Sequence, residues 1–144
     1  MRRTVDADTA AREPHVVWNA FVDLIATEDY ADLSPLQRKA HLAFWYDSEV
    51  QNGGHGQYFE NQGRDRLSET VDALRKLGLS CQARILAHAI ERFSVADPQA
   101  DWADVLPDGF VEQLDAAFHA CSPDVTTGLR AHLEAHKVEY VEVA

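Results

Sequence analysis

Hydrophobic residues recur every three to four positions along most of the chain, and this spacing predicts helices nearly throughout. Residues that start or end helices, mainly Ser, Pro and Gly, separate the periodic stretches. The expected helices cover roughly 14–27, 35–52, 55–62, 65–77, 80–93, 109–121 and 124–139. The pattern therefore predicts an all-α fold, a single irregular bundle of six or seven helices.

The clearest local signals lie at the ends of these helices. Ser34 followed by Pro35 is typical of an N-cap and a first helical residue, and Gly78 is expected to end the fourth helix. Residues 94–109 contain two prolines, which predicts a linker with one short helical turn around Trp102.

Length and composition fit one cytoplasmic domain. In a chain of 144 residues we expect a tail at 1–13 and one helical domain at 14–144, with a short strand or a frayed end at 138–143. No apolar run approaches the roughly 20 residues of a membrane span, and the start lacks the apolar stretch of a signal peptide. Cys81 and Cys121 are too few for a disulfide framework, so we expect both to be reduced, small core residues.

The net charge of −11, from 24 acidic and 13 basic residues, limits the classes of partner that the chain can bind. Nucleic acids and anionic membranes both require a positive surface, so the sequence predicts that the chain binds neither directly. Two interpretations remain open: the acidity serves solubility alone, or it attracts a basic protein partner.

The stretch QNGGHGQYFENQG, residues 51–63, holds four of the seven glycines. A dinucleotide fingerprint G-x-G-x-x-G would need its third glycine at the position of Phe59, and the segment before it is helical in pattern. His55 is the one good acid–base group here, but no serine or cysteine nucleophile lies beside it. We therefore expect neither a nucleotide site nor a catalytic loop.

A structural corner accounts for these unusual residues. Asn52 ends the preceding helix, and we expect Gly53 to be the left-handed residue that closes it, with Gly54 adding a second unusual backbone angle. Gln57 and Asn61 lie four residues apart and so share a helix face. Their amides are expected to pair with free backbone groups of the turn.

The same residues carry a resemblance. Nine residues form a pattern that is similar to the N-G-G-F-x-Q-Y/F-F-x-N signature of the bacterial DNA-mimic protein family. They are Glu49, Asn52, Gly53, Gly54, Gln57, Tyr58, Phe59, Asn61 and Gly63. The resemblance implies an acidic, all-helical protein that could form a homodimer. It also implies a binding role, because a characterised member of that family occupies the DNA-binding surface of a transcription factor. His55 stands where the family usually has Phe, so an aromatic plug is expected to be missing from the corner.

An acidic segment follows in the second half of the chain, because no Lys or Arg occurs between Phe93 and Leu129. The candidate partner-binding residues are Asp97, Asp101, Asp104, Asp108, Glu112 and Asp115. Their spacing of three or four would place them on one face of a continuous helix, although Pro98 and Pro107 interrupt it. Helix capping is the alternative role for Asp97, Asp101, Asp108 and Asp124.

One row of acids is too sparse to imitate DNA by itself. Acids four residues apart rise about 6 Å along a helix, whereas duplex DNA carries a charge about every 1.7 Å of its axis. Mimicry would need a second row, from Asp23, Glu28, Asp29 and Asp32 or from a second copy of the chain.

A histidine pair offers a different chemistry. His132 and His136 lie four residues apart, so one helix face could present both to a metal ion, but further ligands would have to come from elsewhere. His136 also falls in the apolar stripe of its helix, where a hydrogen-bonded core histidine is the alternative.

The sequence therefore predicts a non-enzymatic protein without a cofactor that occupies the basic surface of a DNA-binding protein, such as a transcription factor or a nucleoid protein. Two alternatives stay open. One is an immunity-type protein that neutralises a basic toxin, and the other is a small metal-dependent enzyme that uses His132 and His136.

Overall fold

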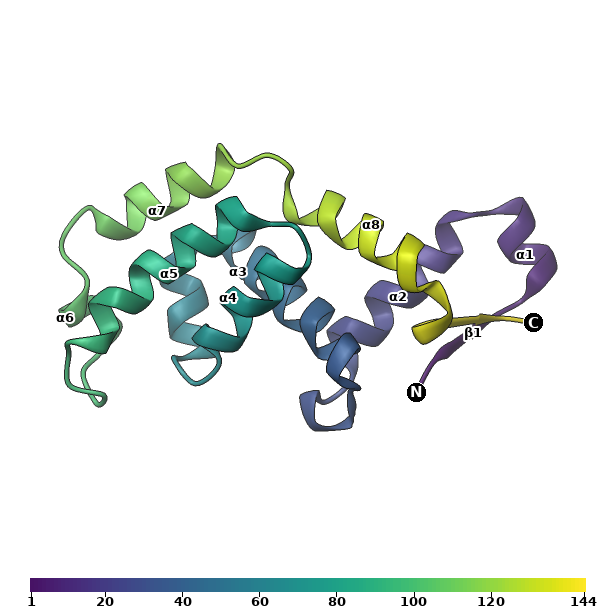
Figure 1. Cartoon of the computed structure of the whole chain (residues 1–144), viewed down its shortest axis with the longest axis horizontal. Helices are drawn as coiled ribbons and strands as arrows, with labels where there is room; N and C mark the ends of the chain where they lie inside the picture. Colours follow the sequence, from purple (N-terminus) through teal and green to yellow (C-terminus); the bar gives the residue numbers. More distant parts are fainter.

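A computed structural model describes all residues from 1 to 144 and shows an elongated array of helices, with a pair of short strands at one end (Figure 1). The eight α-helices are Ala7–Arg12 (α1), His15–Thr27 (α2), Pro35–Gln62 (α3), Leu67–Lys76 (α4), Ser80–Ser94 (α5), Trp102–Val105 (α6), Phe110–His119 (α7) and Val125–His136 (α8). The remaining elements are the 3-10 turns Tyr30–Asp32 (η1) and Lys137–Glu139 (η2) and the strands Arg3–Val5 (β1) and Val141–Val143 (β2). The all-α prediction is confirmed.

Helix α3 lies at the centre of the fold and contacts α2, α4, α6, α7 and α8. It begins at the predicted cap, where the Ser34 hydroxyl accepts the Gln37 N–H at 3.2 Å and the Gln37 side chain accepts the Ser34 N–H at 3.0 Å. The Gln37 amide also donates to the carbonyls of Met1 and Glu139, at 2.7 and 2.8 Å. One side chain thus ties the start of the central helix to both ends of the chain.

A sharp kink divides α3 at Gly53 and Gly54, between the two predicted segments 35–52 and 55–62. The assignment of the left-handed residue to Gly53 is wrong, because Gly53 has φ −150° and ψ 17°. Gly54 is the residue with positive φ, at φ 77° and ψ −178°. That combination is open to glycine almost alone, so Gly54 is the position that requires glycine.

Residues 1–13, expected as a tail, contain β1 and α1. Strand β1 pairs in parallel with β2, with Arg3 opposite Val141. The short strand expected at 138–143 therefore forms, but only over Val141–Val143, because Lys137–Glu139 is a 3-10 turn. The Arg3 guanidinium also pairs with Asp23 and Glu28 of the α2 region, each at 2.7 Å. These long-range contacts order both termini.

The predictions of where helices begin and end are confirmed in part. Gly78 has a positive φ of 77° just after α4, and Asp124 caps α8 by accepting the Thr127 N–H at 2.8 Å. Ser80 is the first residue of α5, and this helix starts without a side-chain cap. Asp108 likewise makes no cap, because Gly109 occupies the N-cap position of α7.

Cys81 and Cys121 form a disulfide, so the expectation of two reduced core cysteines is wrong. The two residues are 40 positions apart in sequence, yet the loop between α7 and α8 brings their Cα atoms within 5.7 Å at the start of α5. The bond closes a loop that contains α5, α6 and α7.

None of the helices is both long and apolar enough to cross a membrane.

Candidate functional site

The corner at residues 49–63 is organised around a buried carboxylate. Glu49 is only 8% exposed, and its side chain accepts the amides of Gln57 at 2.8 Å, Asn61 at 2.9 Å and Gln62 at 3.4 Å. Burial opposes ionisation, but these three hydrogen bonds outweigh it and lower the pKa of Glu49. The prediction that the amides of Gln57 and Asn61 bond the backbone of the turn is wrong, because both amides donate to the Glu49 carboxylate instead.

His55 occupies the centre of the same corner and is fully buried. Its Nδ1 lies 2.7 Å from Oδ1 of Asp115, and its Nε2 lies 2.7 Å from the hydroxyl of Tyr46. Burial lowers the pKa of His55, partly offset by Asp115. A neutral ring satisfies this network, with Nδ1–H donating to the carboxylate and Nε2 accepting from Tyr46.

His55 also fills the space of the expected aromatic plug. Its ring packs against Tyr46, Phe59 and Phe118, with centroids 5.4 to 6.1 Å away. The plug that was expected to be missing is therefore present as an imidazole, which joins an aromatic cluster and hydrogen-bonds within it.

Asp115 of α7 is therefore hydrogen-bonded to the corner. Its Oδ1 also accepts the backbone N–H of His55 at 2.8 Å, and a Cβ atom on Gly54 would lie 2.5 Å from its Oδ2. Helix α7 can approach α3 this closely only because the kink residue has no side chain. Among the candidate partner-binding residues, Asp115 thus has a structural role between α3 and α7.

The other acidic candidates do not lie on one helix. Helix α6 ends at Val105, and α7 begins only at Phe110, so the face expected of a continuous helix is divided between a loop, a four-residue helix and α7. The Asp97 side chain stabilises the loop before α6 by accepting the Gln99 N–H at 2.9 Å. Asp101 caps α6 by accepting the Ala103 N–H at 3.1 Å.

Three acidic residues of the segment remain without an internal role. The exposed side chains of Asp104, Asp108 and Glu112 form neither a hydrogen bond nor an ion pair within the chain. We call these three residues the free acidic group. They lie on α6, on the turn that follows and in the first turn of α7.

Side chains from other elements hold the acidic segment in place. The Arg64 guanidinium donates to the carbonyls of residues 97, 98 and 100 at 2.6 to 3.1 Å. The Trp102 indole N–H donates to Glu60 at 2.7 Å, and its ring lies against Gly56 of the corner. Arg92 stacks over the Phe110 ring at 5.3 Å. Two arginines thus approach a segment whose own sequence has none.

The histidine pair does not gather further ligands. The rings of His132 and His136 lie 4.7 Å apart, and His132 Nε2 is 2.6 Å from the Tyr140 hydroxyl. No group of three or more His, Cys, Asp or Glu side chains in the chain is placed to hold a metal ion. Burial, together with the charges of His136 and Lys39, lowers the pKa of His132 to about 4.

Sequence reasoning missed the partners of His55 and Asp115, and it did not single out Arg64 or Gln62. His55 and Asp115 are 60 positions apart, and Arg64 reaches 33 or more positions along the chain. No local pattern signals such pairs. The amide of Gln62 could have been found, because it continues the series of amides that follows the kink.

Comparison with known proteins gives one match. A family model described as DMP19-like protein matches residues 31–136. The matched range contains the corner, the acidic segment and both cysteines. No curated protein and no solved structure matches the chain.

Proposed function

The chain belongs to the DMP19-like protein family, and we propose that it is a DNA mimic, a non-enzymatic protein that occupies the basic surface of a DNA-binding protein. The observation that carries this proposal is the family match over residues 31–136, because this family is of the DNA-mimic type. The partner is a basic protein such as a transcription factor or a nucleoid protein.

The charge of the chain supports the proposal. A net charge of −11 disfavours binding to nucleic acid itself and favours a positive protein surface. The free acidic group, Asp104, Asp108 and Glu112, supplies carboxylates that no cation of this chain neutralises. A DNA-binding protein presents the Lys and Arg side chains that such carboxylates attract.

The contacts around the acidic segment also support a binding role. The segment is held against α3 and α5 by Arg64, Trp102 and the disulfide, so the backbone that carries its carboxylates is in place before a partner arrives. A preorganised surface loses less side-chain and loop freedom on binding. The proposed mechanism is electrostatic steering of the basic partner onto this surface, without covalent chemistry.

The proposal predicts an interaction that salt weakens and DNA displaces. The tagged protein is used to capture partners from host lysate at low and at high ionic strength, with duplex DNA as competitor. A partner retained at low salt, released at high salt and displaced by DNA supports mimicry, because surface charges are screened over about 8 Å at physiological salt. A partner that survives high salt and DNA competition would contradict it.

Two variants with equal charge change make the test specific. The first replaces the free acidic group by D104N, D108N and E112Q. The control variant D8N/E13Q/E134Q removes three exposed carboxylates elsewhere that also lack internal partners. We expect the first variant to lose the partner and the control to retain it. Equal loss in both would show that net charge, not this surface, governs the interaction.

A further inference from the structure

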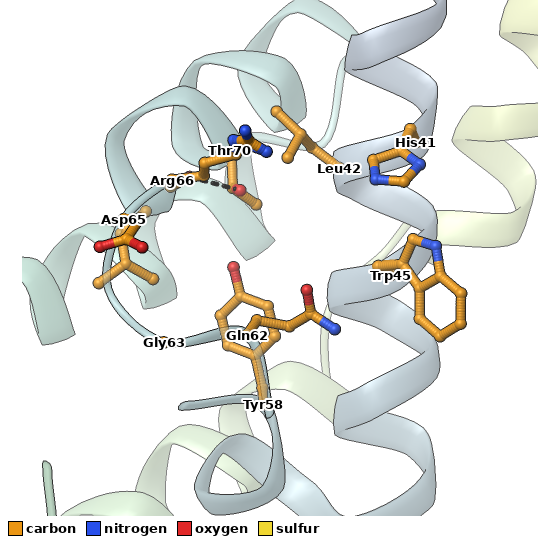
Figure 2. Close-up of a pocket in the computed structure, with 10 residues that line it drawn as sticks. His41, Leu42, Trp45, Tyr58, Gln62, Gly63, Asp65, Arg66 and Thr70 are labelled. Carbon is orange, nitrogen blue, oxygen red and sulfur yellow. Dashed lines mark hydrogen bonds between the residues drawn. The ribbon is translucent and has the colours of Figure 1, made fainter. Parts of the chain in front are cut away.

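A cavity of about 220 Å³ lies in the angle between the two halves of α3 and the start of α4. Figure 2 shows His41 and Trp45 on the first half of α3, Tyr58 and Gln62 on the second half, and Arg66 at the start of α4. The kink in α3 creates this angle by turning the second half away from the axis of the first. The cavity is thus built by the corner, and of the side chains whose contacts are described above only Gln62, which donates to Glu49, lines it.

Arg66 gives the cavity a positive group that lacks an internal anion. Its side chain forms no ion pair and no hydrogen bond within the chain. The guanidinium instead lies over the Tyr30 ring, 3.6 Å from the ring centroid. Stacking of this kind fixes the plane of a guanidinium and leaves its N–H edge available for a carboxylate.

His41 does not add a second positive charge. Its Nδ1 lies 2.7 Å from the carbonyl of Ile25, which fixes the N–H on that nitrogen. Burial lowers the pKa of His41, and the charge of Arg66 lowers it further, so the ring is neutral near pH 7. The charged groups that line the cavity are therefore Arg66 and the carboxylate of Asp65. Their formal charges cancel, which disfavours a multiply charged phosphate, and Arg66 offers a charge-assisted pair to a single carboxylate.

The remaining walls suit a flat apolar body. Leu42 and Trp45 line the side formed by the first half of α3, and Tyr58 is only 4% exposed at the other side. Figure 2 shows the Tyr58 hydroxyl directed toward Thr70, whose own hydroxyl donates to the Arg66 carbonyl at 2.7 Å. Burial raises the pKa of Tyr58 to about 12, so it remains a neutral hydroxyl. The cavity thus pairs one cationic edge with mixed walls, in which Leu42, Trp45, Tyr58 and Leu67 lie beside the polar side chains of His41, Gln62 and Thr70.

We propose that this cavity binds a small planar monocarboxylate, with the carboxylate on Arg66 and the apolar body against Leu42 and Trp45. Pockets for drug-sized ligands occupy roughly 300–1,000 Å³, so a volume of about 220 Å³ limits the ligand to about one ring with its carboxylate. The site is separate from the free acidic group and takes a ligand of opposite charge to the proposed protein partner.

The first probe is sodium benzoate. Its binding is measured by NMR of the full-length protein labelled with nitrogen-15. We expect saturable shifts of the backbone amides of Gly63, Leu67 and Thr70, which line the cavity. Benzamide, the neutral molecule of the same shape, is expected to bind at least about tenfold more weakly, since it cannot form the charge-assisted pair. Inorganic phosphate is expected to leave these amides unshifted.

Arg66→Gln tests the charged contact directly, and Arg75→Gln at the exposed end of α4 is the matched control. We expect Arg66→Gln to weaken benzoate binding by about tenfold or more and Arg75→Gln to leave it unchanged. Circular dichroism of both variants verifies that they remain folded. Equal binding of benzoate and benzamide, equal binding by the two variants, stronger binding of phosphate, or no shift at all would each overturn the proposal.

Discussion

The hydrogen bonds between Asp115 and His55 make a quantitative prediction about the role of α7. Asp115→Ala removes the carboxylate that accepts both the backbone N–H and the ring Nδ1–H of His55, at 2.8 and 2.7 Å. His55 is fully buried, so neither donor can turn to solvent without a rearrangement of the corner. We expect the protein to fold but to unfold more easily.

The magnitude follows from the two donors that lose their partner. A buried donor left unpaired costs about 1–3 kcal/mol. The Asp115 side chain is 29% exposed, so water can enter the vacated space and recover part of the loss. The expected destabilisation is therefore about 2–4 kcal/mol, below the sum of two full penalties. For a protein of this size it lowers Tm by about 5–15 °C.

Urea unfolding followed by circular dichroism measures this change with the disulfide intact. Glu112→Ala is the control, because Glu112 lies three residues earlier on α7, is exposed and has no internal partner. Its free energy of unfolding should stay within about 0.5 kcal/mol of the wild-type value. Asp115→Asn keeps one acceptor oxygen and should fall between the two. If Asp115→Ala unfolded like Glu112→Ala, the assignment of a structural role to Asp115 would be refuted.

Three further predictions test the rest of the architecture. Replacing Cys81 and Cys121 by Ser opens a loop of 40 residues and should lower the free energy of urea unfolding by about 4 kcal/mol; an unchanged midpoint would contradict this. The pKa of His132 is about 4 when folded against 6.5 when free, so the unfolded chain takes up its proton first and stability should be lost as pH falls from 6.5 toward 4. His132→Gln should flatten that slope in pH-dependent unfolding, and an equal slope would exclude the contribution. Gly54→Ala should cost at least about 1 kcal/mol more than Gly109→Ala, because both residues have positive φ but only Gly54 lacks space for a Cβ atom; equal losses in thermal unfolding would argue against the close approach.

The parts of the fold that the sequence predicts well are those decided within a few residues. The cap at Ser34 and the kink after Asn52 depend on hydrogen bonds and backbone angles that span three or four positions. The alternation at the C-terminal end likewise predicts a strand, but not that β1 would be its partner, because the two strands lie at opposite ends of the chain. Local signals therefore identify elements without identifying their neighbours.

The candidate site depends mostly on such distant neighbours. In the sequence, Asp115 is one more member of an acidic row, and only the packing of α7 against α3 shows that it hydrogen-bonds to His55. Cys81 and Cys121 read as unrelated small residues until the loop after α7 meets the start of α5. The glycines after Asn52 predict a corner, and the structure has a kink there. The hydrogen bonds of Glu49 and His55 within this corner do not follow from sequence spacing.

Charge spacing leads to a last prediction about assembly. The free acidic group supplies three carboxylates, whereas duplex DNA carries a charge about every 1.7 Å. Two acids of the second row suggested by the sequence do not complete it. Asp23 and Glu28 pair with Arg3, and α2 lies toward the opposite end of the long axis from α6 and α7 (Figure 1).

A surface of DNA-like charge density therefore needs carboxylates from a second copy of this chain, and we expect the complex with a DNA-binding partner to contain two copies. Light scattering coupled to size-exclusion chromatography of the purified complex measures this stoichiometry. A complex with one copy, lost when Asp104, Asp108 and Glu112 are neutralised, would mean that the partner recognises a few fixed carboxylates rather than an imitation of the duplex. That outcome would preserve the binding surface but reject the spacing argument, since three charges would then suffice where DNA offers several times as many.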